Sequence, residues 1–264
     1  MPGRDSTTFL MYHELRLPGR AIVSDEPGYA RYVVPLDAFE RQMRSIARDG
    51  WQCASVSAWQ AGAGAADSVV VTFDDGAETD LMAAAPVLEA LGQSATFFLT
   101  VDFLGRRGFM TRTQARALAE RGFEVGCHSM THAYLDDLAP DALEREITHA
   151  KQALEDIVGM PVTAFSCPGG RVTPAAVEVA RAAGFTSVCT SETRRNRRED
   201  SPWSLGRVAI LDHTTDAEVT SYAEGRGMMQ QRVRASLLNT GKRLLGNGLY
   251  EALRGRLLGG SSAK

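Results

Sequence analysis

The sequence predicts an α/β fold with a mostly parallel sheet or barrel, and two observations lead to this fold class. Short apolar runs alternate along the chain with longer amphipathic segments, which is typical of strands and helices in parallel α/β folds. The residues that could do chemistry follow the predicted strands directly. In such folds the chemistry gathers in loops at the carboxyl ends of the strands. We therefore expect one large domain with its site at one edge of the sheet.

The densest apolar run covers residues 69–73 and predicts a buried strand that ends at Asp74, Asp75 and Gly76. Residues 15–35 hold proline, glycine and charged residues without periodicity, so a long loop is expected there. Further strands are expected at residues 8–12, 51–56, 95–100, 123–127, 162–165, 186–190 and 205–211.

Helices are expected between these strands because apolar residues recur at helical spacing there. Thr111 and Gln114 have the spacing of a capping box, and Gly122 ends that helix. Pro174 directly after Thr173 is typical of a first helical turn. The expected helices cover residues 37–48, 79–91, 111–122, 141–158 and 173–184.

The composition is typical of a soluble globular protein with reduced cysteines. The 264 residues suit one large barrel or α/β domain with an extension, and 44% hydrophobic with 23% charged residues is ordinary for a soluble protein with a sizeable core. The net charge of −3 argues against a general nucleic-acid binder. The four cysteines are far apart and form no Cys-x-x-Cys pair, so we expect reduced thiols rather than disulfides or a cysteine zinc site.

One carboxylate and two histidines at predicted strand ends suggest a metal site. A divalent metal such as zinc needs about three protein ligands and an open position to activate water. Asp75, His128 and His132 supply such a set, and Asp74 beside them is the natural general base. Each piece alone has a plainer interpretation, because Asp-Asp-Gly is a common turn and a His-x-x-x-His pair can be structural.

Hydrolysis of an amide also needs a group that protonates the departing amine, and histidine suits this task. His13 and His213 are the candidates, since both fall at predicted strand ends or loops. His149 lies inside a predicted helix and is expected to be a surface or core residue.

Three motifs together resemble a known family. Residues 72–76 (Thr-Phe-Asp-Asp-Gly), 128–132 (His-Ser-Met-Thr-His) and 165–170 (Phe-Ser-Cys-Pro-Gly-Gly) are similar in order and spacing to the polysaccharide deacetylases, the NodB-homology or carbohydrate esterase family 4 proteins, over roughly residues 7–215. The resemblance implies a distorted (β/α)7 barrel and a metal-dependent hydrolase that removes acetyl groups, usually from N-acetylated sugars. It implies that Asp74 is the base and that Asp75, His128 and His132 bind a divalent metal. The expected metal is Zn²⁺, with Co²⁺ or Ni²⁺ as alternatives.

The beginning of the chain favours one candidate for the acid. Residues 10–14 (Leu-Met-Tyr-His-Glu) resemble the start of the biofilm poly-N-acetylglucosamine deacetylase branch, in which the histidine near the N-terminus is the acid. The resemblance therefore favours His13. Residues 211–213 (Leu-Asp-His) resemble the late Leu-x-His motif of other members, so His213 remains the alternative acid.

The third motif departs from the family pattern. Family members often carry an arginine and an aromatic residue there, and this chain has neither. We expect the smaller loop to open the pocket and Arg171 to replace the missing charge. Cys167 is expected to be a small wall residue, with a fourth metal ligand as the alternative. The expected substrate-binding residues are Pro168, Gly169, Gly170 and Arg171.

The C-terminal part differs in composition from the rest. We expect a deacetylase-like barrel over residues 1–215 and a basic amphipathic helical extension over residues 216–264. The extension either packs on the barrel or lies on a membrane surface through residues 225–258. No stretch of about 18 apolar residues predicts a spanning helix. The N-terminus has no signal-peptide pattern, so the expected location is cytoplasmic, where the protein could lie at the inner membrane surface. A chain whose signal peptide had been removed would begin in the same way.

The predicted function is therefore a metal-dependent hydrolase that removes an N-acetyl group from a sugar of a polysaccharide, an oligosaccharide or a lipid-linked glycan precursor. The enzymatic alternatives are an amidase, a deformylase or an O-acetyl esterase on the same scaffold. The non-enzymatic alternative is a glycan-binding module that has lost catalysis. The identity of the glycan, its chain length, the metal and the oligomeric state do not follow from the sequence.

Overall fold

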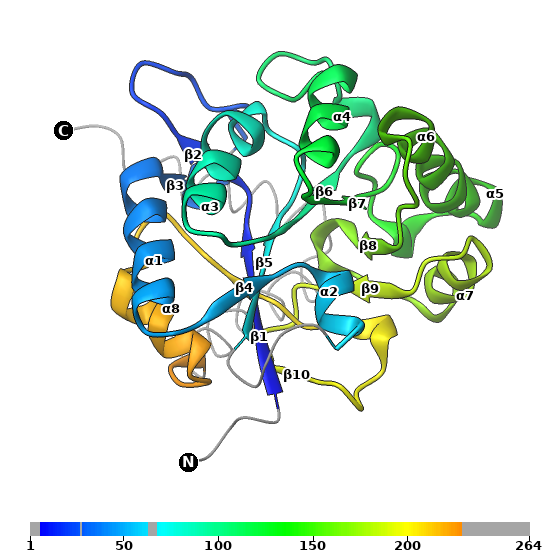
Figure 1. The fold of residues 1–264 in the computed structure, drawn as a ribbon. Helices are drawn as coiled ribbons and strands as arrows, with labels where there is room; N and C mark the ends of the chain where they lie inside the picture. Colours follow the sequence, from blue (N-terminus) through cyan, green and yellow to red (C-terminus); the bar gives the residue numbers. More distant parts are fainter. Residues whose placement is uncertain (1–5, 27, 63–67, 229–264) are drawn as a thin grey trace.

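The computed structural model of the protein describes residues 6–26, 28–62 and 68–228, and its central feature is a curled, mostly parallel sheet with helices packed around it (Figure 1). Within these residues the nine strands have the order β10-β1-β5-β6-β7-β8-β9, with β11 beside β1 and β4 beside β5. The strands are β1 (Ser6–Tyr12), β4 (Gln52–Ala54), β5 (Ser68–Phe73), β6 (Thr96–Leu99), β7 (Glu124–Cys127), β8 (Ala164–Ser166), β9 (Ser187–Cys189), β10 (Asn196–Arg197) and β11 (Val208–Ala209). The predicted α/β class with a mostly parallel sheet is confirmed.

One short segment connects the two ends of the sheet. Leu205 forms a parallel bridge with Cys189 of β9, and Val208 of β11 pairs in parallel with Leu10 of β1. Residues 205–209 therefore lie between the last strand and the first, so they bring the curled sheet close to a closed barrel. Arg207 lies in the middle of this segment.

The helices cover the outside of the sheet, as Figure 1 shows. They are α1 (Leu36–Arg48), α2 (Val56–Gln60), α3 (Ala85–Ala90), α4 (Arg112–Glu120), α5 (Pro140–Glu144), α6 (Ala150–Val158), α7 (Pro174–Ala182) and α8 (Asp216–Ala223). The predicted capping box is present, because the Thr111 hydroxyl accepts from Gln114 N and the Gln114 side chain accepts from Thr111 N. Thr173 likewise caps α7 by accepting from Ala176 N. Shorter 3₁₀ turns lie at Tyr29–Tyr32, Val101–Phe103, Leu135–Asp137, Pro168–Gly170 and Pro202–Ser204.

Several details of the predicted element map are wrong. The expected loop at 15–35 contains two short strands, β2 (Glu14–Arg16) and β3 (Val33–Pro35), which pair in parallel. Strands of three residues are too short to show a period in the sequence. The expected helices at 79–91 and 141–158 are each interrupted by a π-helical segment, Asp80–Ala84 and Arg145–His149. The helix α2 and the strand β10 were not expected.

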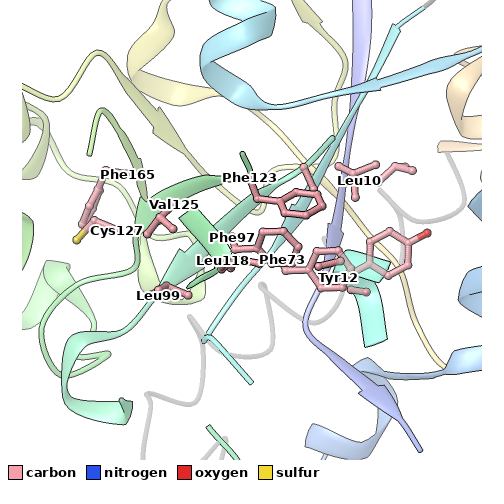
Figure 2. Packing of buried hydrophobic residues seen from close by; sticks show 14 of the residues in the cluster. Leu10, Tyr12, Phe73, Phe97, Leu99, Leu118, Phe123, Val125, Cys127 and Phe165 are labelled. Atoms are coloured by element: carbon pink, nitrogen blue, oxygen red, sulfur yellow. The ribbon is translucent and has the colours of Figure 1, made fainter. Parts of the chain in front are cut away.

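The core is divided by the alternation of side chains along each strand. Along β5, Val69, Val71 and Phe73 join the large apolar cluster that includes helix residues such as Phe39, whereas Val70 joins a smaller cluster. In the large cluster the rings of Tyr12, Phe73 and Phe97 stack in sequence, with centroids 5.3 and 5.0 Å apart (Figure 2). This packing holds the ends of β1, β5 and β6 in a fixed relation, and the candidate site is built at those ends.

The first part of the expected extension belongs to the packed domain. Helix α8 lies beside α1 (Figure 1), and its residues Val219, Tyr222 and Ala223 are in the same apolar cluster as the barrel helices. Residues 229–264, which carry most of the predicted membrane-contact segment, lie outside the described residues, so the division at residue 215 stays a prediction. Among the described helices, none combines the length and the hydropathy needed to cross a bilayer.

Candidate functional site

The two adjacent carboxylates follow the buried strand β5 and point to different partners. Asp74 continues the sheet by one residue, because its N–H donates to Tyr12 O at 3.0 Å. Asp75 has a left-handed backbone with φ 77°, which turns the chain sharply after Asp74. Gly76 follows with φ 85°, and a Cβ there would lie 3.0 Å from the Leu99 side chain, so the turn needs glycine.

Asp75 lies against both histidines of the His-x-x-x-His motif. Asp75 Oδ1 is 3.5 Å from His128 Nε2 and 3.4 Å from His132 Nε2. One ligand atom from each of the three side chains lies within 4.8 Å of the others, and this is the one such cluster within the residues that the structure describes. The structure therefore brings together the three residues that the sequence predicts to hold a metal.

His128 is oriented by its second ring nitrogen. Its Nδ1 is 2.8 Å from Ser166 O, which is a carbonyl acceptor, so Nδ1 carries the proton and Nε2 keeps its lone pair toward Asp75. Burial lowers the pKa of His128 to about 4, with His132 and Arg207 acting in the same direction and Asp74 and Asp75 in the opposite one. The imidazole is therefore neutral at pH 7, which is the form that binds a metal ion.

The three side chains fit a divalent metal ion. Asp75 Oδ1 is buried and has no hydrogen-bond partner among the described residues, which is costly unless a cation or water completes it. A carboxylate and two imidazoles are the donor types of catalytic zinc sites, and cobalt and nickel accept the same donors. The side chain of His132 is 33% exposed, so one side of the cluster is open to solvent and substrate.

Asp74 is held by an arginine that the sequence analysis did not single out. Arg207 is 1% exposed, and its Nη1 and Nη2 donate to Asp74 Oδ1 and Oδ2 at 2.7 and 2.8 Å. The same guanidinium donates to Thr190 O, to Thr72 Oγ1 and to Ser166 Oγ. Burial alone would raise the pKa of Asp74, but Arg207, followed by His128 and His13, outweighs it and holds that pKa well below its usual range.

Arg171 does not take the place that the sequence analysis expected. Its guanidinium lies over the Tyr134 ring, 4.1 Å from the centroid, and donates to the Asp136 carboxylate at 3.3 Å. The arginine that contacts Asp74 in this structure is Arg207. The only signal in the sequence is a basic residue in an otherwise apolar predicted strand at 205–211, where a buried charge needs a buried partner.

The glycines of the third motif make room for neighbouring side chains. A Cβ on Gly169 would lie 2.6 Å from the Tyr134 ring, and one on Gly170 would lie 1.9 Å from Ser191 Oγ. At these two positions the small residues accommodate Tyr134 and Ser191, so they do not enlarge a cavity. Pro168 and Cys167 are buried, and Cys167 is not part of the cluster that could hold a metal. All four cysteines are free thiols, as expected.

The two histidines considered as the acid lie in different places. His13 follows β1, its ring packs against Tyr32 with centroids 4.8 Å apart, and it contributes to the low pKa of Asp74. His213 is 55% exposed, pairs with Asp212 at 2.8 Å and lines an open groove of about 560 Å³ with residues of α1 and α8. The structure therefore brings His13 to the Asp74 side of the site and places His213 on the groove beside α1.

The comparisons with known proteins agree with this arrangement. Residues 61–188 match the sequence model of the polysaccharide deacetylase family. YxkH of Bacillus subtilis strain 168, which is named for polysaccharide deacetylation, is 26% identical over 72% of this chain and 70% of its own length. A peptidoglycan-N-acetylglucosamine deacetylase of Bacillus cereus is 31% identical over 55% of this chain and 65% of its own length.

A solved structure is similar over most of the chain. IcaB from Ammonifex degensii has a TM-score of 0.70 at 25% identity, and the alignment covers 83% of this chain and 97% of that one. The predicted distorted (β/α)7 barrel of the NodB-homology type is confirmed. The curled sheet, the cluster at its carboxyl edge and these similarities together support a polysaccharide deacetylase.

Proposed function

We propose that this protein is a metal-dependent hydrolase that removes an N-acetyl group from a sugar of a polysaccharide, an oligosaccharide or a lipid-linked glycan precursor. One observation carries the proposal: Asp75, His128 and His132 converge within 4.8 Å, while Asp74 beside them is engaged by Arg207 and stays outside the cluster. A binding module would not need both a metal-binding triad and a separate ionised carboxylate.

Asp75, His128 and His132 would hold the ion, and a bound divalent metal supplies acidification of a water and polarisation of the acetyl carbonyl. Asp74 is ionised because Arg207 holds its pKa low, so its carboxylate can accept the proton of the attacking water. Ser166 Oγ donates to Asp74 Oδ2 at 3.4 Å and accepts from Arg207, so the carboxylate is held on two sides. A base held in this way needs no rearrangement when the proton is transferred.

His13 is the proposed acid. The amide C–N bond breaks as the nitrogen takes a proton, and the products are acetate and a sugar amine. His13 lies at the end of β1 next to the end of β5, since Tyr12 pairs with Phe73, so its ring is on the same edge of the sheet as Asp74. His213 is the alternative acid, and its exposed position with Asp212 makes it the weaker one.

The substrate class rests on the family and on a relative. The Bacillus cereus relative is named as acting on N-acetylglucosamine of peptidoglycan, and the polysaccharide deacetylase family acts on N-acetylated glycans. An N-formyl amide or an O-acetyl ester would meet the same base and metal-binding residues. Deformylase or esterase activity is therefore the enzymatic alternative, and a glycan-binding module is the non-enzymatic one.

The test combines metal content with product analysis. The wild type and a His128→Ala/His132→Ala double variant are incubated with zinc, cobalt or nickel, dialysed and measured by elemental analysis. We expect about one metal per wild-type chain and loss of the metal in the variant. Acetate and formate release is then compared for N-acetylated, N-formylated and O-acetylated oligosaccharides. A wild type that binds none of the three metals would contradict the proposal, and release from esters alone would replace it with the esterase alternative.

Membrane contact is a separate part of the proposal, and it rests on the basic amphipathic pattern of residues 225–258. Met228 packs in the apolar cluster of the domain, so a truncation for its test should begin at residue 229. Flotation with anionic vesicles of the full chain and of the truncated chain should show binding of the full chain only. Equal partitioning of both would exclude the segment as the anchor and with it the location at the inner membrane surface.

A further inference from the structure

The three residues between the two histidines form a strained turn. Ser129 and His132 both have left-handed backbones, with φ 67° and 69°, a conformation that residues other than glycine rarely adopt. Ser129 O accepts from Val101 N at 3.2 Å, and Ser129 Oγ accepts from His132 N at 3.0 Å. Such a turn persists only when its surroundings hold it, so its other contacts are informative.

Glu146 makes three further contacts with this turn from a distant helix. Its Oε2 accepts from Met130 N at 3.0 Å and from Thr131 N at 2.8 Å, and its Oε1 accepts from Thr131 Oγ1 at 2.8 Å. The side chain is 2% exposed. Hydrogen bonds to an ionised carboxylate are stronger than neutral ones, and burial strengthens them further.

The position of Glu146 depends on an irregular piece of helix. It lies in the π-helical segment Arg145–His149, between α5 and α6. π-Helical turns contain one extra residue and are frequent at functional sites because they change the direction in which a side chain points. Among the described residues, the hydrogen bonds of this buried carboxylate go to Met130 and Thr131.

The two histidines differ in how they are held. His128 is buried and its Nδ1 is bound to Ser166 O, so its ring is fixed without the turn. His132 is partly exposed. Its ring packs against Phe103 and His128 at centroid distances of 5.8 and 5.0 Å, its Nε2 lies 3.4 Å from Asp75 Oδ1, and no hydrogen bond among the described residues holds its Nδ1. The direction of the His132 side chain is therefore set mainly by the backbone of the turn.

We propose that Glu146 is a positioning residue that holds the turn at residues 129–131 so that His132 Nε2 stays directed at Asp75. The inference rests on the proposed function, because it assigns a task toward the metal that Asp75, His128 and His132 would bind. Without Glu146, two backbone N–H groups and one hydroxyl lose their acceptor, and the left-handed residues relax toward ordinary backbone conformations.

The test measures zinc affinity by competition with a chelating indicator, separately from the stability of the metal-free protein. Glu146→Ala should weaken zinc binding about 10- to 100-fold, the range found for residues that orient metal ligands. Glu144→Ala is the matched control, because Glu144 is exposed and lies two residues away in α5. Glu146→Gln should recover part of the affinity, since its amide oxygen can still accept from both N–H groups.

The outcomes separate the two proposals. Zinc binding by the wild type with equal affinity in the Glu146→Ala and Glu144→Ala variants would overturn this inference and leave the proposed function intact. A wild type that binds no zinc would overturn both. If circular dichroism shows that Glu146→Ala does not fold, Glu146→Asp is used in its place. This variant keeps the carboxylate but shortens the side chain by one methylene. Its zinc affinity is judged against Glu144→Ala in the same way.

Discussion

The guanidinium of Arg207 contacts both carboxylate oxygens of Asp74, with Nη1 2.7 Å from Oδ1 and Nη2 2.8 Å from Oδ2. The two residues are 133 positions apart in the sequence, and both are almost fully buried. Parallel contacts of this kind give arginine a geometric specificity that lysine lacks. Of the groups that keep the proposed base ionised, this distant side chain has the largest effect.

Arg207→Gln should destabilise the protein by about 3–5 kcal/mol, because it leaves Asp74 as a buried carboxylate without a cationic partner. The pKa of Asp74 should rise, since Arg207 is the largest of the groups that lower it. A base works when ionised, so the fall of kcat/KM at acidic pH should begin at higher pH in the variant. Urea unfolding and a pH–rate profile measure the two effects.

The control for this change is Arg171→Gln. Arg171 pairs with the partly exposed Asp136, so its loss should cost no more than about 1 kcal/mol. Equal losses of stability in the Arg171 and Arg207 variants would show that the buried Arg207–Asp74 pair stabilises the protein no more than the partly exposed Arg171–Asp136 pair.

Asp75→Asn should abolish metal binding, whereas Asp74→Asn should leave it unchanged. Asp75 lies 3.4–3.5 Å from both histidine Nε2 atoms, whereas Asp74 is engaged by Arg207. The Asp74 variant should keep its metal and lose roughly 10²- to 10⁴-fold in kcat, as expected for the loss of a general base. The Asp75 variant should lose the metal. Elemental analysis and acetate release check both, and appreciable turnover by Asp74→Asn would contradict its assignment as the base.

His13→Ala should lower kcat on N-acetylated oligosaccharides by roughly 10²- to 10⁴-fold, the usual contribution of a general acid. Its defect should be much smaller on an aryl acetate, because a phenolate leaves without taking a proton. His213→Ala is the matched variant, and we expect it to stay within a few-fold of the wild type because His213 is exposed beside Asp212. The reverse order of the two defects would make His213 the acid.

Asp80→Asn should stabilise the metal-free protein at neutral pH. Asp80 is buried with neither carboxylate oxygen hydrogen-bonded among the described residues. Burial, followed by Asp75 and Glu14, raises the pKa of Asp80 well above its ordinary value of 3.8. The folded wild type thus keeps a proton that the unfolded chain has lost, so its stability falls as pH rises from about 4 toward the folded pKa.

The asparagine variant cannot titrate, so its advantage should grow by about 1.4 kcal/mol per pH unit between the two pKa values. Thermal unfolding at pH 4 and pH 7.5 after removal of metal by a chelator measures this difference. Asp156→Asn is the control, because Asp156 is exposed on α6. An advantage that is the same at both pH values would show that Asp80 is ionised in the folded protein.

The parts of the site that were predictable from the sequence are those whose signals are local. Asp74 and Asp75 directly follow a dense apolar run, and His128 and His132 directly follow another, so the parallel-strand rule places them at one edge. The capping box at Thr111 was equally local, and it is confirmed. In each case neighbouring residues carry the whole pattern.

Arg207 and Glu146 were missed because their partners lie far away in the chain. Arg207 reaches Asp74 because residues 205–209 pair with both β9 and β1. The sequence around position 207 contains no pattern that predicts this pairing. Glu146 reaches the turn at Met130 and Thr131 from a π-helical segment, where the extra residue shifts the helical period that a sequence reading assumes. The sequence analysis expects Arg171 to replace the missing charge because Arg171 directly follows the third motif. In the folded protein Arg171 lies over Tyr134 and pairs with Asp136 instead.

The placement of Arg207 on residues 205–209 also concerns the order in which the molecule is assembled during synthesis. A nascent chain that has emerged as far as β9 already contains both carboxylates and both histidines of the site, but not the guanidinium that keeps Asp74 charged inside the barrel. Under the proposed function, the base is therefore complete only after residues 205–209 have docked between β9 and β1. The segment that joins the two ends of the sheet is thus the same segment that completes the surroundings of the proposed base.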